Sequence, residues 1–317
     1  MPLQHLLIPF AVPLSEAGLA ACGTLALPNL ARLLARWTLI ERDEGDAYSL
    51  SPPHERALAS AWGWTAPDGL LPFAAQAAAD DGFAPASDGT GWGLLRPTHW
   101  HADAQQVSVT DPAALRLDAA AARVFFDALA PLFTDDGWAL RWGAPDRWYA
   151  THTNLTTLPT ASLDRVVGRD IDLWLQSHPQ ARRLRRLQAE AQMLLHAHPL
   201  NAEREGQGLL PVNSFWLSGT GVSALADTAR RAAVQVDERL RAPALAEDWA
   251  TWAEAWQRLD AEVLPALVSA APSADTSIKI TLCGERSAHT WAPRPQPLWQ
   301  RWLGARQVNP LPLLSAL

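Results

Sequence analysis

The segment from residue 198 to residue 221 holds the densest set of side chains that could bind a ligand. The chain there is expected to leave a long helix, cross a glycine-containing loop, follow an apolar strand and end in a Gly-x-Gly turn. The backbone amides of such a turn can hold an anion, and an arginine can grip a phosphate or a carboxylate through two parallel hydrogen bonds. The candidate ligand-binding residues are Asn201, Arg204, Asn213, Ser214, Gly219 and Gly221.

The same segment has a second interpretation that needs no ligand. Asn213 and Gly219 would simply shape the turns at the two ends of a buried strand. An isolated Gly-x-Gly, without the rest of a phosphate-binding motif, is weak evidence for a nucleotide or phosphate site.

The sequence His99-x-His101-x-Asp103 is the candidate metal site. If this stretch is extended, alternation places the three side chains on one face, where imidazoles and a carboxylate could hold one divalent ion. The alternative is a polar, solvated loop end. No cofactor is otherwise expected, so a divalent metal here is the open alternative.

Two further clusters lie on expected helices. Arginines occupy positions 182, 183, 185 and 186 of the helix expected over 180–198. They form either a solvated face or a site for an anion or a partner. The chain is rich in tryptophan, with 16, and Trp249, Trp252 and Trp256 fall on one stripe of a helix expected over 244–268. Such a stripe is typical of a core-facing surface.

The overall composition excludes several classes of protein. A hydrophobic fraction of 48% and a charged fraction of 19% indicate a packed globular protein. The net charge of −7 argues against nucleic acid and anionic membranes as partners. The two cysteines, Cys22 and Cys283, form no disulfide or metal pattern, and no long apolar run indicates a membrane span. We therefore expect a cytoplasmic protein.

Strand and helix patterns interleave along the chain without a regular βαβ repeat. We expect strands at 3–12, 92–97, 105–110, 138–142, 146–151, 212–217, 277–283 and 287–292. We expect helices at 28–37, 53–63, 70–79, 118–133, 180–198 and 244–268. This order predicts an α/β fold with a mixed sheet flanked by helices. Residues 1–317 are expected to form a single α/β unit; the alternative is an N-terminal layer, 1–90, with a main body, 91–317.

The pattern H-P-x-N-x-x-R-x-x-G-x-x-P-x-N-S-x-W-x-x-G-x-G, beginning at His198, resembles a bacterial family labelled cofactor-independent phosphoglycerate mutase or regulatory protein. Further similar stretches are Leu95–Asp103, Asp146–Tyr149, Val167–Arg169 and Glu190–His196. The 198–221 segment is also similar to one in archaeal-type phosphoglycerate mutases of the alkaline phosphatase superfamily. The resemblance implies an alkaline-phosphatase-like core, two divalent metals held by Asp and His clusters, and a Ser or Thr nucleophile.

The sequence departs from the mutase pattern where the chemistry would be carried out. No aspartate follows the first strand before Asp43, and the C-terminal region offers only His289. Ser218 stands where the mutases place an arginine before the Gly-x-Gly. A two-metal site needs several converging carboxylates and imidazoles. The resemblance therefore implies a degenerate core whose fold is retained without the mutase ligands.

Three functions remain open, and the sequence does not decide whether the protein is an enzyme. The first is a degenerate, phosphomutase-like binding or regulatory protein that takes a phosphorylated small molecule near Arg204 and Asn213. The second is a metal-assisted phosphoryl-transfer or hydrolytic enzyme that uses His99 and Asp103. The third is a protein-interaction module, whose protein partner would dock on exposed tryptophans.

Overall fold

The computed structural model describes residues 4–84, 89–104, 106–175, 179–222, 224–269, 278–293, 310, 314 and 317. Contacts divide the chain into two compact units. Unit 1 comprises residues 1–47, 52–63 and 227–317, and unit 2 comprises residues 48–51 and 64–226. Whether either unit folds independently is a separate question, so the domain organisation expected from the sequence stays a prediction.

Unit 1 is built around a mixed, five-stranded sheet in the order β2-β11-β10-β1-β9. Its strands are β1 (His5–Ile8), β2 (Trp37–Asp43), β9 (Val234–Val236), β10 (Lys279–Cys283) and β11 (Ala288–Pro293). Strand β1 runs parallel to both β10 and β9, whereas β11 is antiparallel to β10 and to β2. The mixed sheet predicted from the sequence is thereby confirmed.

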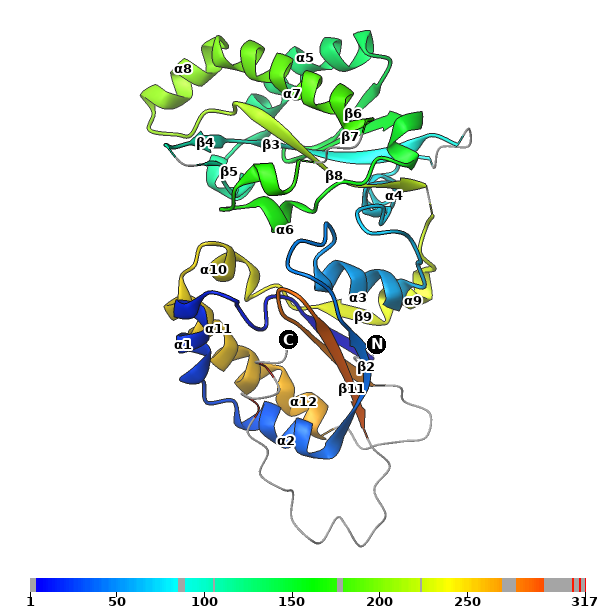
Figure 1. Ribbon diagram of the computed structural model, residues 1–317, viewed down its shortest axis with the longest axis vertical. Coiled ribbons are helices and arrows are strands. Elements are labelled where there is room, and N and C mark those ends of the chain that lie inside the picture. The colour runs from blue at the N-terminus through cyan, green and yellow to red at the C-terminus, as the bar shows by residue number, and fades with distance from the viewer. Residues whose placement is uncertain are drawn as a thin grey trace, which may run out of the picture. The chain divides into compact units, whose positions relative to one another are not determined.

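Helices cover both faces of this sheet (Figure 1). They are α1 (Glu16–Gly23), α2 (Pro28–Arg36), α3 (Pro53–Trp62), α9 (Thr228–Ala232), α10 (Arg241–Leu245), α11 (Trp249–Glu262) and α12 (Leu264–Ser269). Leu6 and Ile8 pack with α2, α11 and α12, while Leu7 packs toward α3 on the opposite face. This alternation follows from the two-residue period of a strand.

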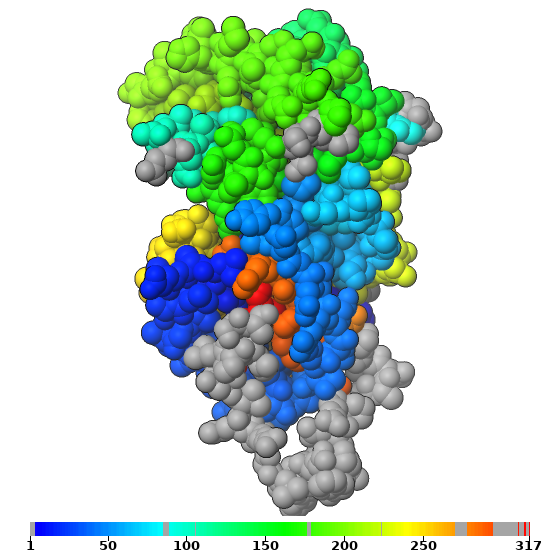
Figure 2. All heavy atoms as spheres, in the orientation of Figure 1, coloured from blue at the N-terminus to red at the C-terminus, as the bar shows by residue number. Residues whose placement is uncertain are grey.

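The tryptophan stripe of α11 forms part of this core, as predicted. Trp252 and Trp256 are fully buried, and their indole N–H groups donate to the carbonyl oxygens of Phe10 and Ala11 at 3.0 and 3.1 Å. Leu314 and Leu317 belong to the same core. In Figure 2 the red end of the chain lies beside the orange β10–β11 hairpin, where the Ser287 N–H donates to the Leu317 carbonyl oxygen.

Unit 2 holds an antiparallel four-stranded sheet in the order β6-β7-β3-β8 and a separate two-stranded ladder. The sheet strands are β3 (Gly91–Thr98), β6 (Ala139–Ala144), β7 (Arg147–His152) and β8 (Ser214–Val222), and the ladder joins β4 (Trp100–Ala102) to β5 (Val107–Val109). The hairpin predicted for 138–142 and 146–151 is the β6–β7 pair.

The helices of unit 2 also cover both faces of its sheet (Figure 1). They are α4 (Phe73–Asp80), α5 (Ala119–Asp135), α6 (Leu163–Val166), α7 (Ala181–His196) and α8 (Pro199–Gly206), with 3-10 turns η1 (Pro112–Leu115), η2 (Thr153–Thr156) and η3 (Ile171–Leu173). α5 and α7 share one apolar core, which includes Phe125, Leu187 and Phe215. α4 packs its alanines against Trp92 and Tyr149 in another.

No single helix in the described part of the chain is long and apolar enough to cross a membrane. α1 and α2 meet the length and composition requirement only as a pair, and they are bent by 84° at the break between them.

Candidate functional site

Residues Pro199–Gly206 form helix α8, where the sequence suggested a glycine-containing loop. His198 caps the first turn of α8 by accepting a hydrogen bond from the Leu200 N–H, and Pro199 occupies the first helical position, which suits proline. Asn201 and Arg204 lie on the buried side of α8, with 5% and 4% of their surface exposed. The helix therefore directs both candidate side chains into the protein interior.

Asn201 and Arg204 use their hydrogen-bonding groups on the backbone. Asn201 donates to the carbonyl oxygens of Leu195 and Val212 at 2.8 and 2.7 Å, and its Oδ1 accepts from the Val212 N–H. Arg204 donates from Nε and Nη2 to the Leu210 carbonyl oxygen and from Nη2 to that of Leu115. Burial holds the pKa of the Arg204 guanidinium below its ordinary value. These two side chains therefore hold α8 against the neighbouring segments of the chain through hydrogen bonds to their backbone.

Asn213 and Ser214 also turn inward. The amide of Asn213 forms two hydrogen bonds with the backbone of Trp100, accepting from its N–H at 2.7 Å and donating to its carbonyl oxygen at 2.8 Å. Ser214 is fully buried directly opposite Thr98 in the β3–β8 ladder. Neither hydroxyl has a hydrogen-bond partner in the described part of the chain. Asn213 thus fixes the start of β8 against β4.

The Gly-x-Gly sequence is not a turn at the end of β8, because the strand continues through it to Val222. The register against β3 shifts here: Trp92 faces Gly221 and Leu94 faces Ser218, which leaves an extra residue on β8 as in a β-bulge. Gly221 has φ of 147°, and a Cβ atom there would lie 2.4 Å from the Leu70 carbonyl oxygen. The lack of side chains on these glycines leaves room for the chain before α4, and the turn predicted at this Gly-x-Gly is wrong.

The His-x-His-x-Asp sequence contributes β4, the first strand of the β4–β5 hairpin. The His99 ring Nδ1 lies 3.0 Å from the Pro211 carbonyl oxygen, and Asp103 closes the turn by accepting from the Gln106 N–H. The His99 and His101 ring centres are 6.5 Å apart. Within the described ranges no group of three His, Cys, Asp or Glu side chains could hold a metal ion. The structure thus does not gather His99, His101 and Asp103 around one point.

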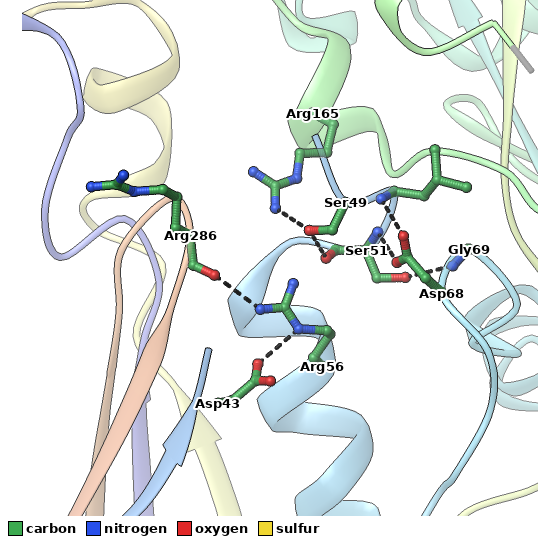
Figure 3. Close-up of polar contacts among 9 residues, drawn as sticks. Asp43, Ser49, Ser51, Arg56, Asp68, Gly69, Arg165 and Arg286 are labelled. Atoms are coloured by element: carbon green, nitrogen blue, oxygen red, sulfur yellow. Dashed lines mark hydrogen bonds and ion pairs between the residues drawn. The ribbon is translucent and has the colours of Figure 1, made fainter. Parts of the chain in front are cut away.

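Polar networks elsewhere are similarly occupied (Figure 3). In unit 2, Asp68 accepts from the backbone N–H groups of Leu50 and Ser51 at 2.7 and 2.8 Å. In unit 1, Arg56 pairs with Asp43 at 2.7 Å and donates to the Arg286 carbonyl oxygen at 3.0 Å. These contacts fix loops and helix ends in the way that capping groups do.

A third network lies where the predicted Asp146–Tyr149 motif meets α4. Arg147 forms two hydrogen bonds with the Asp81 carboxylate, and the Tyr149 hydroxyl donates to the same group at 2.7 Å. The bond from Arg147 holds the pKa of Asp81 below its ordinary value, and burial together with Asp81 raises that of Tyr149. The motif therefore links β7 to the end of α4.

The described tryptophans are all buried or half-buried. The exposed indoles required by the hypothesis of a tryptophan docking surface do not occur in this part of the chain; Trp299 and Trp302 lie outside the described residues.

Unit 2 also contains a cavity of about 30 Å³, which, unlike these networks, is space that the protein's own side chains do not fill. Its walls come from the loop before α6, from the end of η3, from α7 and from β8. The lining residues are Leu158, Pro159, Thr160, Ala161, Trp174, Leu175, Ala181, Leu184, Arg185, Gln188, Trp216 and Leu217. The cavity is mainly apolar and has room for a group of only a few heavy atoms.

Gln188 and Trp174 are the buried residues of the lining whose side-chain polar groups differ most in their hydrogen bonding. Gln188 is 4% exposed, and its Nε2 donates to the Phe215 carbonyl oxygen at 3.5 Å. The Trp174 indole N–H, also buried, has no hydrogen-bond partner among the described residues. A buried polar group without a partner costs about 1–3 kcal/mol. The Trp174 indole N–H therefore points to a missing partner.

Positive charge is concentrated where α7 begins, beside this cavity. The N-cap residue Gln180 makes no capping hydrogen bond, and the positive end of the helix dipole adds to the charge of the arginines. Arg183 and Arg186 are both paired with Asp136. Arg185 lines the cavity itself, while Arg182 is exposed and outside it. The arginine cluster seen in the sequence is thus partly neutralised and partly directed at the cavity.

Sequence reasoning included Arg185 within the arginine cluster but missed Gln188, Trp174 and the cavity. Three separate stretches of chain and one helix build it, and no local motif marks their convergence. The available signal for the cavity was Gln188, which lies one turn from Arg185 on the same face of a basic helix.

No protein-family model matches the sequence, and no curated protein matches it. Two solved structures have a distant likeness to the chain. The PH0037 protein from Pyrococcus horikoshii is 13% identical with a TM-score of 0.46, covering 92% of this chain and 88% of that one. A cofactor-independent phosphoglycerate mutase from Thermoplasma acidophilum is 14% identical with a TM-score of 0.38, covering 99% and 98%. Neither likeness is close enough to transfer a fold or an activity.

Proposed function

We propose that the protein binds a small anionic molecule in the cavity beside α7. The observation that carries this proposal is the cavity itself, because Arg185 and Gln188 line it from one face of α7 and the Trp174 indole N–H in its lining is buried without a partner in the described residues. Groups three residues apart on a helix are neighbours, so one small ligand can contact both. The basic start of α7 supplies the electrostatic attraction for an anion.

This proposal keeps the anionic ligand expected from the sequence and moves its site. Arg204 and Asn213 were the residues expected to hold a phosphorylated molecule, yet their donors are occupied by backbone carbonyl oxygens. An anion at Arg204 would have to displace several buried hydrogen bonds, each of which would leave a carbonyl oxygen unsatisfied. An anion near Arg185 would instead enter a cavity that already exists in the fold.

Ligand-observed NMR with three probe anions (inorganic phosphate, propionate and L-lactate) tests the proposal, because it detects weak binding. We expect at least one of these anions to bind wild-type protein and Arg182→Gln, and none to bind Arg185→Gln. The two variants remove the same charge from the same helix, and only Arg185 lines the cavity. Equal binding by both variants, or no binding to wild-type protein, would overturn the proposal.

A further inference from the structure

The His152 ring lies between the 3-10 turn η2 and the start of α7, and it contacts both. Its Nδ1 accepts a hydrogen bond from the Asn154 N–H at 3.0 Å, which caps the first turn of η2. Its Nε2 lies 3.3 Å from Nη1 of Arg183 on α7. We propose that His152 is a pH-sensitive link, which holds η2 beside α7 when the ring is neutral and releases η2 when the ring binds a proton.

Both neighbours of the ring are donors, which is why a proton acts on the link. A backbone N–H and a guanidinium can donate hydrogen bonds and cannot accept them. A neutral imidazole has one nitrogen that accepts, so it can bond to Asn154 or to Arg183. A protonated imidazole has none, because both of its nitrogens are then donors. Protonation therefore removes the cap of η2 and places a second cation beside Arg183.

The charged groups around the ring do not compensate for this second cation. Arg183 lies on α7, and the opposing charge is Asp136 at the end of α5. Asp136 already pairs with both Arg183 and Arg186, so its attraction is shared among several cations. The neighbour of His152 on β3 is Gly91, which has no side chain. The surroundings of the ring therefore favour its neutral form.

The direction of the pH dependence follows from these surroundings. Burial, followed by the charge of Arg183, lowers the pKa of His152 below its ordinary value of about 6.5. In the unfolded chain the ring takes up its proton near that ordinary value. The cap therefore stabilises η2 fully above about pH 6.5 and is lost as the pH falls through the lower pKa of the folded protein.

A stack with Trp138 keeps the ring in position while this happens. The two ring centres are 5.1 Å apart and the planes are 17° from parallel. A protonated ring can keep this contact, since a cation on the face of an indole is favourable. It cannot keep the hydrogen bond from Asn154. The ring thus stays beside α7 while η2 loses its cap.

The link acts on one wall of the cavity beside α7, whatever that cavity binds. Residues 158–161 follow η2 directly and line the cavity, while α7 supplies the facing residues. At the other end of η2, the Thr157 hydroxyl donates to Oε1 of Gln180 at 3.0 Å, a contact that does not titrate. His152 is therefore the proton-dependent part of the attachment between η2 and α7.

Amide hydrogen exchange of the full chain, followed by NMR, tests the link without a ligand. The Leu158 N–H donates to the Asn154 carbonyl oxygen at 3.0 Å, so its protection reports on η2. The Ala150 N–H in β7 reports on the sheet beside it. We expect the protection of Leu158 relative to Ala150 to fall about fivefold as the pH is lowered from about 7 to about 4.5, the effect of losing one helix cap.

Three variants separate the link from other effects of pH. Asparagine can cap η2 but cannot titrate, so His152→Asn should keep its relative protection over the whole range. Arg183→Gln removes the facing cation and should move the midpoint of the loss to higher pH. Arg182→Gln removes the same charge from an exposed position on the same helix and should leave the midpoint where it is.

Two results would overturn the proposal outright: constant relative protection of Leu158 in the wild-type protein, or an equal loss in His152→Asn. A midpoint that is the same in Arg183→Gln and in wild-type protein would also overturn it, because the contact with α7 is part of the link. None of these outcomes depends on anion binding, so the proposal and the proposed function can fail separately.

Discussion

The segment from 198 to 222 and the cavity beside α7 both bring polar side chains into the interior of unit 2. In the first, Asn201, Arg204 and Asn213 each meet two backbone groups, so that their hydrogen-bonding capacity holds α8 and β8 in place. In the second, Trp174 is as deeply buried, yet its indole N–H has no partner in the described residues. The density of polar residues in a sequence motif therefore does not by itself indicate a ligand site. A better indication is a buried hydrogen-bonding group that the fold leaves without a partner.

The largest expected effect is a difference in stability between variants of Arg204 and of Arg185. Arg204→Met should lower the free energy of unfolding by about 4 kcal/mol, because it leaves the carbonyl oxygens of Leu210 and Leu115 unsatisfied in the interior. Arg185→Met should lower it by less than about 1 kcal/mol, since that side chain is half-exposed. Urea denaturation of both variants provides the measurement. Similar losses of unfolding free energy in both variants would mean that the hydrogen bonds of Arg204 do not hold α8 in place as described.

His5 in unit 1 is a buried, titratable side chain with a hydrogen-bond partner, and it extends the comparison of buried polar groups. Its Nε2 lies 2.7 Å from the Thr281 hydroxyl, and burial, followed by the charge of Lys279, lowers its pKa to about 4. In the unfolded chain the pKa is about 6.5. Between these values the unfolded state binds more protons, so stability is complete above pH 6.5 and is lost as the pH falls toward 4.

The expected loss from His5 over this window is about 3 kcal/mol, and it is measured as the pH dependence of the unfolding free energy. His5→Gln can still hydrogen-bond to Thr281 but cannot titrate, so the profile between pH 4 and 6.5 should become flatter. An unchanged profile would mean that His5 is not protonated on unfolding in this range.

The elements that the sequence predicted well have a continuous periodic signal. The helix expected over 180–198 is Ala181–His196, and the stripe of Trp252 and Trp256 faces the core. β9 has three residues and was missed, because so short a segment has no detectable period. α8 was taken for a glycine-containing loop, although His198 followed by Pro199 is a helix start signal and Gly206 is the last residue of the helix.

The site was harder to predict than the fold for a related reason. Arg204 and Asn213 have the same residue types whether they bind backbone or ligand, and the difference lies in neighbours far along the chain, such as Leu115 and Trp100. Gln188 belongs to a helix that the sequence identified, but its place in the cavity wall depends on segments far along the chain, such as those of Leu158 and Trp216.

A smaller effect tests the β-bulge that replaced the predicted turn. Gly221→Ala should lower the unfolding free energy by about 2 kcal/mol, because its φ of 147° is unfavourable for a side chain and the added Cβ would meet the Leu70 carbonyl oxygen. Gly206, at the end of α8, has open space around it, so Gly206→Ala should be neutral or stabilising by up to about 1 kcal/mol. Thermal denaturation distinguishes the two. A neutral Gly221→Ala would return the Gly-x-Gly to the candidate anion-binding elements.

The smallest effect, and the one with the opposite sign, concerns the buried hydroxyls of the β3–β8 ladder. Ser214 has no hydrogen-bond partner in the described ranges, so Ser214→Ala removes an unsatisfied group and should leave the unfolding free energy unchanged or raise it by less than about 1 kcal/mol. Thr220 on the same strand donates to the Leu158 carbonyl oxygen at 2.6 Å, so Thr220→Val should cost about 1 kcal/mol or more. Because Ser214 was a candidate ligand residue, its alanine variant should be assayed for anion binding as well. Unaltered binding with unaltered or higher stability would mean that a polar residue of the motif serves neither the fold nor the ligand, whereas lost binding would reassign the site from Arg185 to β8.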